Sequence, residues 1–330
     1  MKQRTLGAAG PIIGAVGYGA MSFSDFYGKT TDQISMTVLD ECLDLGITHL
    51  DTSDVYGGGR SETVIGEWIR RKGSNPFTIA TKGGIKREAD EHGRFDNSAA
   101  YLTNALEASL QRLGVDHVDL YYVHRRDPRW DIEEVTETLA GLVRAGKCRA
   151  IGYSEIAPSS LRRAHAVHPV TAVQSEFSLS TRSPEMGLVQ TCAALGTALV
   201  AFSPVGRALL TDTPHDRKAA AEIPFLANNP RFVEPNISAN LAKNAQFREL
   251  AADMGLAAAS LAIAWLLHQG DHVIPIPGTR SLHHLREAAA GAAIELAESD
   301  FARIDAVLPV GWAHGDRYSA AQWVGPERYS

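Results

Sequence analysis

The chain has 330 residues, of which 45% are hydrophobic and 21% charged, and its formal net charge is -6. This is the composition of a globular protein, and the negative balance argues against a nucleic-acid-binding surface. No apolar run approaches the roughly 20 residues that span a bilayer, and the N-terminus lacks the order of a signal peptide. We therefore expect a cytoplasmic protein with no nucleic-acid or membrane partner. A homo-oligomer stays open, because composition does not bear on the oligomeric state.

The cysteines and histidines predict neither a disulfide nor a metal site. Cys42, Cys148 and Cys192 are odd in number and lack CxxC spacing, so we expect buried free thiols in a reducing compartment. Two pairs of histidines are close in the sequence, His165 with His168 and His283 with His284. Neither pair comes with the carboxylates or cysteines that a metal site needs.

Strand-like and helix-like segments alternate along the chain. Two short runs at 2–7 and 11–17 predict a hairpin, and 16–20 reads as the first barrel strand. Further strands are expected at 48–53, 77–82, 119–124, 148–155, 172–178, 198–204 and 272–280. Helices are expected at 31–46, 61–73, 98–114, 131–146, 157–168, 184–196, 239–255, 257–270, 281–292 and 297–307, before a polar, irregular tail.

Eight strand–helix units in a chain of this length predict an α/β fold of one domain over 1–330. We expect a (β/α)8 TIM barrel with an N-terminal β-hairpin and long loops over its C-terminal face. A doubly wound sheet is the competitor, but no helix opens directly after the glycines of 14–28. The stretch from about 207 to 240 is expected to be one long loop over the barrel mouth.

Four polar residues stand at or just past the ends of three successive predicted strands. They are Asp51 and Tyr56, Lys82, and His124. In a parallel barrel the chemistry sits at the C-terminal ends of the strands, so we expect these side chains to meet. A single Asp at the end of a strand is usually a helix cap, and a single Tyr usually packs in the core. The hypothesis of a shared site therefore rests on the four residues together.

These four residues suit proton donation to a carbonyl group. A free Tyr has a pKa near ~10, and an ammonium beside Tyr56 would lower it. Lys82 supplies that charge, Asp51 holds Lys82 by pairing with it, and His124 donates a hydrogen bond that orients the substrate. No side chain donates a hydride, so a nicotinamide cofactor is implied.

On these residues the chain resembles the aldo-keto reductase superfamily, over nearly its whole length. The stretches HLDTSDVYGGGRSE, TKGG, SLQRLGVDHVDLYYVHRRDP and AVQSEFSL resemble the hallmarks of that family in order and spacing. The resemblance implies Tyr56 as general acid, Lys82 and Asp51 as its tuners and His124 as substrate orienter. The HRxDP sequence is similar to the bacterial and plant branch of pyridoxal and perakine reductases, and more distantly to potassium-channel β-subunits.

The resemblance also implies a cofactor site for NADPH/NADP+, with NADH less favoured. Ser154 and Gln174 match residues that bind the nicotinamide carboxamide, and Phe202 stands where a stacking Tyr is usual. Arg280 matches the loop that binds the 2′-phosphate of NADPH in the family. An Arg suits that role, because its guanidinium group can bind a phosphate through two hydrogen bonds. The full set implied to bind the cofactor is Ser154, Gln174, Phe202, Ser203, Pro204, Gly206, Arg207, Gly278, Thr279, Arg280 and Glu287.

Three positions depart from the family pattern. Glu155 replaces a usual Asn and cannot donate a hydrogen bond as an amide does, so we expect it to turn away or to weaken the nicotinamide grip. Ala288 replaces an Asn beside the adenine, and His284 replaces a longer side chain. None of them touches the proton-transfer residues.

The substrate pocket is the least specified part of the sequence. Two interpretations stand for the candidate residues: they line an apolar, aromatic pocket, or they pack the loops together. Arg125 and Arg126 would meet an anionic substrate or pair with carboxylates such as Asp127. The candidates are Met21, Phe23, Tyr27 and Trp130, together with Phe26.

Three functions stay open on this basis. The first is an NADPH-dependent reductase of small aldehydes or ketones, with the reverse oxidation of alcohols left open. It is favoured because the proton-donating set comes with the Arg280 loop. The second is an NADPH-binding sensor or regulatory subunit with little turnover. The third is a barrel lyase or isomerase that uses Lys82 as a Schiff-base amine.

Overall fold

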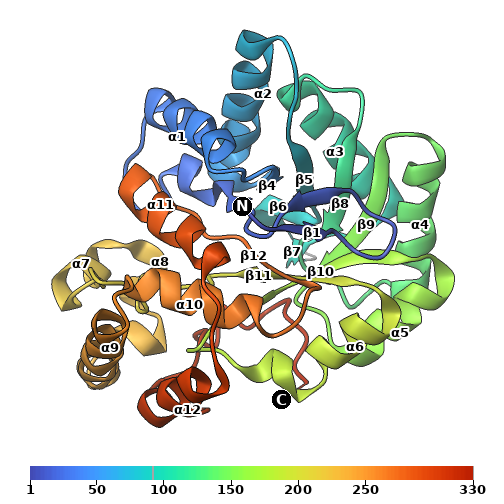
Figure 1. Ribbon diagram of the computed structural model, residues 1–330. Coiled ribbons are helices and arrows are strands. Elements are labelled where there is room, and N and C mark those ends of the chain that lie inside the picture. Colours follow the sequence, from blue (N-terminus) through green and yellow to red (C-terminus); the bar gives the residue numbers. More distant parts are fainter. Residues whose placement is uncertain (91–92, 330) are drawn as a thin grey trace.

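In the computed structural model, which describes residues 1–90 and 93–329, eight parallel strands form one sheet that curls into a barrel (Figure 1). Backbone hydrogen bonds from Gly17 to Pro275 (3.0 Å) and from Gly19 to Pro277 (3.1 Å) join the first strand to the last. The expected TIM barrel is thereby confirmed. In order around the sheet the strands are β3 (Tyr18–Gly19), β4 (His49–Asp51), β5 (Thr78–Gly83), β8 (Val118–Val123), β9 (Cys148–Ser154), β10 (Val170–Glu176), β11 (Ala198–Phe202) and β12 (Val273–Pro275).

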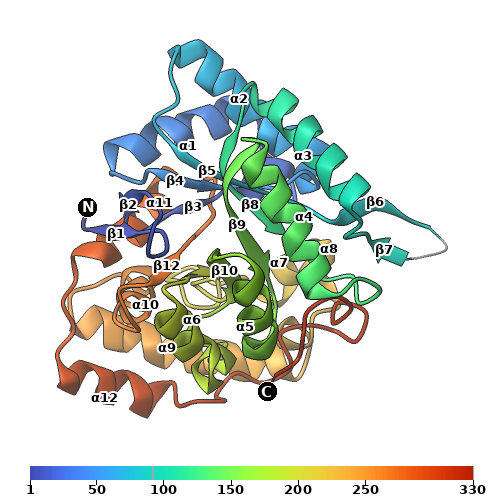
Figure 2. The ribbon, with the colours of Figure 1, turned by 90° about the vertical axis from the view of Figure 1, so that its right-hand side faces the viewer.

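Helices surround the barrel and cover the outer face of its strands (Figures 1 and 2). Several begin at side-chain caps that the sequence supplies: Thr31 accepts from the Ile34 amide, and Ser98 from that of Tyr101. The main helices are α1 (Asp32–Asp44), α2 (Arg60–Lys72), α3 (Ala99–Leu113), α4 (Ile132–Arg144), α5 (Pro158–Val167), α6 (Leu188–Leu195), α9 (Asn236–Asp253), α10 (Ala258–Leu267), α11 (Leu282–Ala290) and α12 (Glu298–Val307).

Alternate residues of each strand divide the core into an inner and an outer layer. Leu120 and Tyr122 of β8 face the barrel interior, whereas Tyr121 and Val123 pack under the helices. The interior cluster also includes Leu6 and Ile13, which flank the N-terminal hairpin of β1 (Gln3–Thr5) and β2 (Ile12–Gly14). The predicted hairpin is therefore present, and its flanks help to fill the barrel.

A second hairpin, β6 (Ile85–Asp90) with β7 (Gly93–Phe95), was not expected from the sequence. Figure 2 shows it projecting from the barrel beside α3. The exposed faces of β6 carry charged side chains and lack the alternating apolar residues from which strands are recognised.

The expectation of one long loop over 207–240 was wrong. This segment contains α7 (Arg217–Glu222), α8 (Pro224–Ala227), the 3-10 turn η4 (Pro230–Phe232) and the start of α9. The Asp216 carboxylate caps α7 by accepting from the Ala219 amide (2.7 Å), and prolines begin the next two elements. These elements are too short for a helical period to show in the sequence.

The C-terminal tail is irregular but well anchored across the C-terminal ends of the strands. The Trp312 indole donates to the Leu179 carbonyl (2.8 Å), just past β10. The amide of Glu327 donates to the Glu155 carbonyl (2.8 Å), just past β9. The tail therefore closes part of the barrel mouth.

The three cysteines are buried and free, as expected. Within 1–90 and 93–329, no group of three or more His, Cys, Asp or Glu side chains is placed to hold a metal ion. Over the same residues, no single helix is long and apolar enough to cross a membrane, and α9 with α10 passes that test only across an 85° bend.

Candidate active site

Asp51, Tyr56 and Lys82 form one hydrogen-bonded cluster at the C-terminal end of the barrel. The Lys82 ammonium donates to the Asp51 carboxylate, to the Thr52 carbonyl (2.8 Å) and to the Tyr56 hydroxyl (3.2 Å). Lys82 and Asp51 are almost entirely buried, and the Lys82 nitrogen lies 4.9 Å from the centre of the Tyr56 ring. We call these three residues the catalytic cluster, after the role that the sequence predicts for them.

The local backbone explains why Tyr56 turns back toward the two strands. Beyond β4 the chain stays beside β5, because the Asp54 amide donates to the Lys82 carbonyl (3.2 Å). Tyr56 then begins a 3-10 turn in which Gly57 and Gly58 have φ of 61° and 63°. Residues other than Gly rarely adopt this left-handed backbone conformation, so the two glycines allow the chain to turn back toward the strands.

His124 completes the set of four predicted residues. It follows β8, where its amide donates to the Gly83 carbonyl (2.8 Å). Its ring meets the Tyr56 ring edge-on, with centroids 5.7 Å apart and planes at 82°. Its Nδ1 atom lies 3.0 Å from the hydroxyl of Ser53, a residue that the sequence did not single out. The structure thus brings all four predicted residues together.

The electrostatics of the cluster differ in one respect from expectation. Burial raises the pKa of Tyr56 above its usual value, and the nearby Lys82 ammonium only partly offsets this. Burial also opposes the charge on Lys82, but Asp51 and Tyr56 outweigh it, so the pKa of Lys82 is raised. The Lys82 charge acts on Tyr56 in the expected direction, but the expected net decrease was wrong.

His124 is held as a neutral ring. Burial, followed by the charges of Arg125 and Lys82, lowers its pKa well below the usual range. A neutral imidazole carries one proton, on either Nδ1 or Nε2. With Nδ1 beside Ser53, Nε2 is the ring nitrogen left to meet a substrate.

Ser154 and Gln174 lie next to these residues, at the ends of β9 and β10. The Gln174 amide donates to the second oxygen of Asp51 (2.7 Å). The Ser154 hydroxyl accepts from Arg125 (2.9 Å), so its own proton stays available for donation. Phe202 ends β11 and is half-buried. These three predicted cofactor residues share the barrel mouth with the catalytic cluster.

The loop after β11 has an unusual backbone. Ser203, Gly206 and Arg207 all have positive φ, at 49°, 61° and 55°. Such conformations are uncommon for residues other than Gly and are often found where a backbone binds a ligand. Pro204, the remaining predicted residue of this loop, is buried.

Five charged residues form a second buried network, which we call the mouth cluster. Glu155 pairs with Arg317, Glu176 pairs with Arg207, and Arg317 and Arg231 lie 3.5 and 3.7 Å from Glu176. Arg207 and Arg317 also lie over the aromatic ring of Tyr318. The members of this network are Glu155, Glu176, Arg207, Arg231 and Arg317.

The mouth cluster resolves two expectations about the cofactor site. Glu155 does turn away, because its carboxylate is engaged by Arg317 and by the Glu176 amide (2.9 Å). The Arg207 guanidinium likewise donates to the Glu176 carboxylate, so its charge is already paired. Neither Arg231 nor Arg317 was singled out in the sequence, because nothing local marks a distant partner. Arg317, for example, lies 162 residues from Glu155.

The predicted 2′-phosphate loop lies against the first strand. A Cβ on Gly278 would come within 2.4 Å of the Gly19 carbonyl oxygen, so only glycine allows this approach. The Thr279 carbonyl accepts from Tyr18 (2.6 Å), and Arg280 donates to the carbonyls of Tyr27 (3.0 Å) and Lys29. Glu287 lies on the following helix, 3.1 Å from His283.

The candidate pocket residues do not share one environment. Phe23 is fully buried and packs on Tyr18, with ring centroids 5.3 Å apart, so its role here is packing. Met21, Tyr27 and Trp130 are half-buried.

The two arginines after His124 also differ. Arg126 lies 3.6 Å from the Glu327 carboxylate of the tail. Asp127, which was considered as a partner for these arginines, pairs instead with Arg129. In the described part of the chain no carboxylate lies within ion-pair distance of Arg125, whose guanidinium donates to the His124 carbonyl and to Ser154.

Comparison with known proteins gives one consistent result. A model of the Aldo/keto reductase family matches residues 15–309. A probable aldo-keto reductase 1 from Glycine max is 36% identical over 317 residues, covering 95% of this chain and 90% of the relative. The aldo-keto reductase yakc [NADP(+)] from Schizosaccharomyces pombe is 35% identical over 312 residues, covering 93% and 92%.

Solved structures give the same picture. The chain is similar to the glycerol dehydrogenase AKR11B4 from Gluconobacter oxydans, with a TM-score of 0.82, 26% identity, and coverage of 93% and 94%. It is also similar to the thermostable aldo-keto reductase Tm1743, with a TM-score of 0.73, 27% identity, and coverage of 93% and 100%.

Proposed function

The chain belongs to the Aldo/keto reductase family, and from that premise we propose that it reduces aldehyde or ketone groups of small molecules with NADPH. The observation that carries the proposal is the Lys82 ammonium, which bridges the Asp51 carboxylate and the Tyr56 hydroxyl beside His124. We further infer one domain over the whole chain and, from its three buried free thiols, a reducing compartment such as the cytoplasm.

In this proposal Tyr56 donates the proton. The raised pKa of Tyr56 keeps the proton on the phenol at neutral pH, as a general acid requires before reaction. The ammonium of Lys82 then stabilises the phenolate that forms when the proton leaves. Asp51 keeps Lys82 charged in a buried place where an unpaired ammonium would be unfavourable. His124 directs the carbonyl oxygen toward Tyr56 through Nε2.

The cofactor, when bound, supplies the hydride that goes to the carbonyl carbon. The residues fit such a group in two respects. The loop after β11 has the positive-φ backbone described above, and Ser154 and Phe202 lie at the mouth beside it. Arg280 donates only to backbone carbonyls, and no carboxylate of the described chain pairs with it, so its charge is available to a phosphate.

Two predicted cofactor contacts are less direct. The Gln174 amide is engaged by Asp51, so we propose that it holds the nicotinamide carboxamide through its carbonyl oxygen. Arg207 is neutralised by Glu176, so we propose that the backbone of 203–207, rather than this guanidinium, meets the pyrophosphate. Gly278, Thr279 and Glu287 are proposed to complete the grip on the adenine end.

Within the family we propose the branch of pyridoxal and perakine reductases, which the residues from His124 to Pro128 support. The choice of NADPH over NADH rests on Arg280 and agrees with the NADP(+) in the name of the Schizosaccharomyces pombe relative. The three half-buried residues Met21, Tyr27 and Trp130 are proposed to meet the substrate.

The test is turnover of NADPH and NADH against a panel of aldehydes and ketones that includes pyridoxal. Tyr56→Phe is expected to lower kcat by about 10²- to 10⁴-fold while leaving NADPH binding nearly unchanged. Tyr153→Phe is the matched control, because the Tyr153 hydroxyl is hydrogen-bonded to the Thr136 hydroxyl (2.7 Å) and does not contact the catalytic cluster. If Tyr56→Phe retained most of its turnover, the assignment of the acid would be wrong.

A second variant tests the cofactor. Arg280→Ala is expected to weaken NADPH by roughly 10- to 100-fold, the loss of a charged hydrogen bond, and NADH only slightly. Arg286→Ala, on the helix that follows, is the control because its guanidinium pairs with Glu41. Equal losses for both cofactors would contradict the 2′-phosphate role. Tight NADPH binding without turnover of any carbonyl would favour the sensor function instead.

A further inference from the structure

Ser53 stands between His124 and a carboxyl group that faces a separate cavity. The Ser53 hydroxyl lies 3.0 Å from Nδ1 of His124 and 3.1 Å from the carboxyl oxygen of Asp54. A third acceptor, the Lys82 carbonyl, is more distant at 3.4 Å. Ser53 is fully buried and Asp54 only 9% exposed, so water competes little for these contacts.

We propose that Ser53 is a positioning residue that sets the tautomer of His124, and that the protonation of Asp54 decides where the Ser53 proton points. This inference rests on the proposed carbonyl reduction, because it concerns the ring nitrogen that meets the substrate in that reaction. It adds two residues, Ser53 and Asp54, to the four that the family pattern implies.

The argument begins from the single proton of the Ser53 hydroxyl, which has two nearby acceptors. If Ser53 donates to Nδ1 of His124, the ring proton is on Nε2, where it can be donated to a carbonyl. If Ser53 donates to Asp54, then Nδ1 must carry the ring proton and donate it to the Ser53 oxygen. Nε2 is then a bare acceptor, which cannot orient a carbonyl oxygen.

The charge of Asp54 selects between these two arrangements. An ionised carboxylate is a stronger acceptor than a neutral imidazole nitrogen, so it attracts the Ser53 proton. A protonated Asp54 no longer competes, and the Ser53 proton turns to His124. Reduction is therefore favoured by the protonated form of Asp54.

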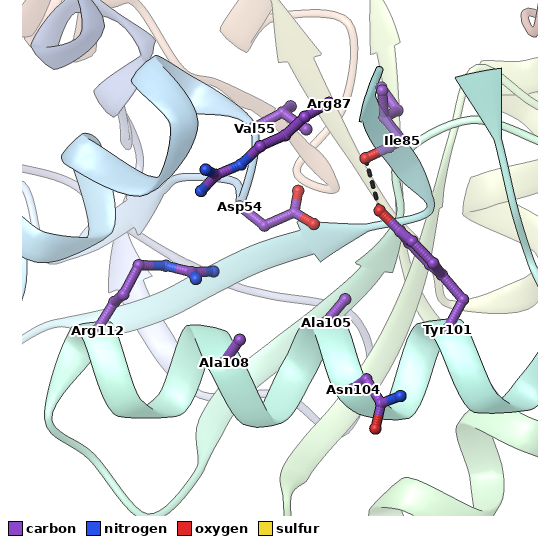
Figure 3. Close-up of a pocket in the computed structure, with 9 residues that line it drawn as sticks. All are labelled: Asp54, Val55, Ile85, Arg87, Tyr101, Asn104, Ala105, Ala108 and Arg112. Atoms are coloured by element: carbon purple, nitrogen blue, oxygen red, sulfur yellow. Dashed lines mark hydrogen bonds between the residues drawn. The ribbon is translucent and has the colours of Figure 1, made fainter. Parts of the chain in front are cut away.

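The surroundings of Asp54 allow both forms near neutral pH. Asp54 lines a cavity of about 250 Å³ between the loop after β4, the β6 strand and α3. Figure 3 shows its carboxyl among Arg87, Tyr101 and Arg112. Glu62 on α2 also acts on Asp54, and the charge of Asp54 in turn acts on Tyr121 of β8.

These neighbours do not hold Asp54 as an anion. Over the described residues no cation lies within ion-pair distance of its carboxyl, because Arg112 is engaged by Glu62 and Arg87 donates to the Gly58 carbonyl. Burial, followed by the charge of Glu62, raises the pKa of Asp54 to about 7. His124 itself stays neutral in this range, since Arg125 and Lys82 add to the effect of burial on its ring.

The first test measures the tautomer directly, with no substrate. Nitrogen NMR of protein labelled in its histidines distinguishes a protonated ring nitrogen from a bare one, and His124→Gln identifies the His124 signals. Between about pH 5.5 and about pH 8.5 we expect the proton to move from Nε2 to Nδ1, with a midpoint near the pKa of Asp54. An unchanged His124 tautomer over this range would overturn the proposal.

Two variants refine the test. Asp54→Asn cannot ionise, so the pH-dependent change of tautomer should vanish, whereas Asp116→Asn, an exposed carboxylate before β8, should leave it intact. Ser53→Ala should abolish the change and lower kcat/KM for reduction by about 5- to 10-fold, the effect of one neutral hydrogen bond. Persistence of the change in Asp54→Asn would count against the role of Asp54.

Activity gives the matching readout. In the wild-type chain kcat/KM for carbonyl reduction should fall as pH rises through about 7, and this fall should be absent in Asp54→Asn. Failure of the proposed function is distinguishable from failure of this inference, because the NMR measurement needs neither substrate nor cofactor.

Discussion

The catalytic cluster and the mouth cluster are both buried charge networks, but they are built differently. The catalytic cluster has one cation, one carboxylate and a phenol, and its two charged members lie 31 residues apart on neighbouring strands. The mouth cluster has three guanidinium groups and two carboxylates, which come from the residue after β9, from β10, from the loop after β11, from η4 and from the tail. One is local in sequence, and the other links distant parts of the chain.

The difference indicates what each network does. In the catalytic cluster, one of the three hydrogen bonds from Lys82 goes to Tyr56, a group that can lose a proton. In the mouth cluster the carboxylates are enclosed by guanidinium groups that do not titrate in the physiological range. We therefore expect loss of the first network to affect chemistry most, and loss of the second to affect stability.

The largest expected effect comes from Lys82→Met. It removes the ammonium that would stabilise the Tyr56 phenolate, so kcat should fall by about 10²- to 10⁴-fold. Arg317→Met, the corresponding change in the mouth cluster, should lower kcat far less. Steady-state kinetics of both variants, with circular dichroism to verify folding, makes the comparison. Equal losses of kcat would show that the two networks do not divide the work in this way.

The next largest effect is on stability. Arg317→Met leaves the buried carboxylate of Glu155 without its cation, which should lower the free energy of unfolding by about 3–5 kcal/mol. The double variant Arg317→Met with Glu155→Gln removes both charges and should recover much of that loss. Urea unfolding followed by tryptophan fluorescence measures both. A double variant no more stable than the single one would mean that packing of Arg317 matters more than its charge.

A third prediction uses Asp54, a buried carboxyl outside both networks. Its pKa is raised from 3.8 to about 7 on folding, so the folded chain binds its proton more tightly than the unfolded chain does. The Asp54 contribution to stability is therefore present below about pH 4 and is lost as pH rises to about 7. At about 1.4 kcal/mol per pH unit, the free energy of unfolding falls over this range by at most about 4 kcal/mol. The unfolding free energy of Asp54→Asn should lack this decrease, whereas that of Asp116→Asn should retain it.

The smallest expected effect comes from a neutral member of the mouth region. The Thr181 hydroxyl donates to Glu176 (3.0 Å) and accepts from Arg231 (2.7 Å). Thr181→Val keeps the shape and removes the hydroxyl, which should lower the free energy of unfolding by about 1 kcal/mol. A loss as large as that of Arg317→Met would mean that this hydroxyl, and not charge pairing, holds the cluster together.

Much of the fold could be predicted from the sequence. The eight strands and the main helices carry clear periodicity, and glycines or caps mark many of their ends. The β6–β7 hairpin and the short helices α7 and α8 were missed because they are too short or too polar to show a period. The first hairpin was found because a turn separates two short runs.

The four candidate catalytic residues could also be predicted from the sequence to lie together, for a simple geometric reason. Parallel strands bring their C-terminal ends to one edge, so polar residues at those ends must meet wherever the strands are neighbours. Ser53 lies within the same stretch as Asp51 and Tyr56, yet its contact with His124 depends on the rotation of two side chains, which no spacing specifies.

The sequence by itself therefore determined the barrel and the four residues at its mouth, because both follow from the alternation of strands and helices along the chain. Its motifs, through their resemblance to known proteins, indicated the family. Only the tertiary structure decided the partner of Glu155, the engagement of Arg207 and the position of Asp54 beside a cavity. Those outcomes depend on where loops and the tail come to lie, and burial then fixes which charges must pair.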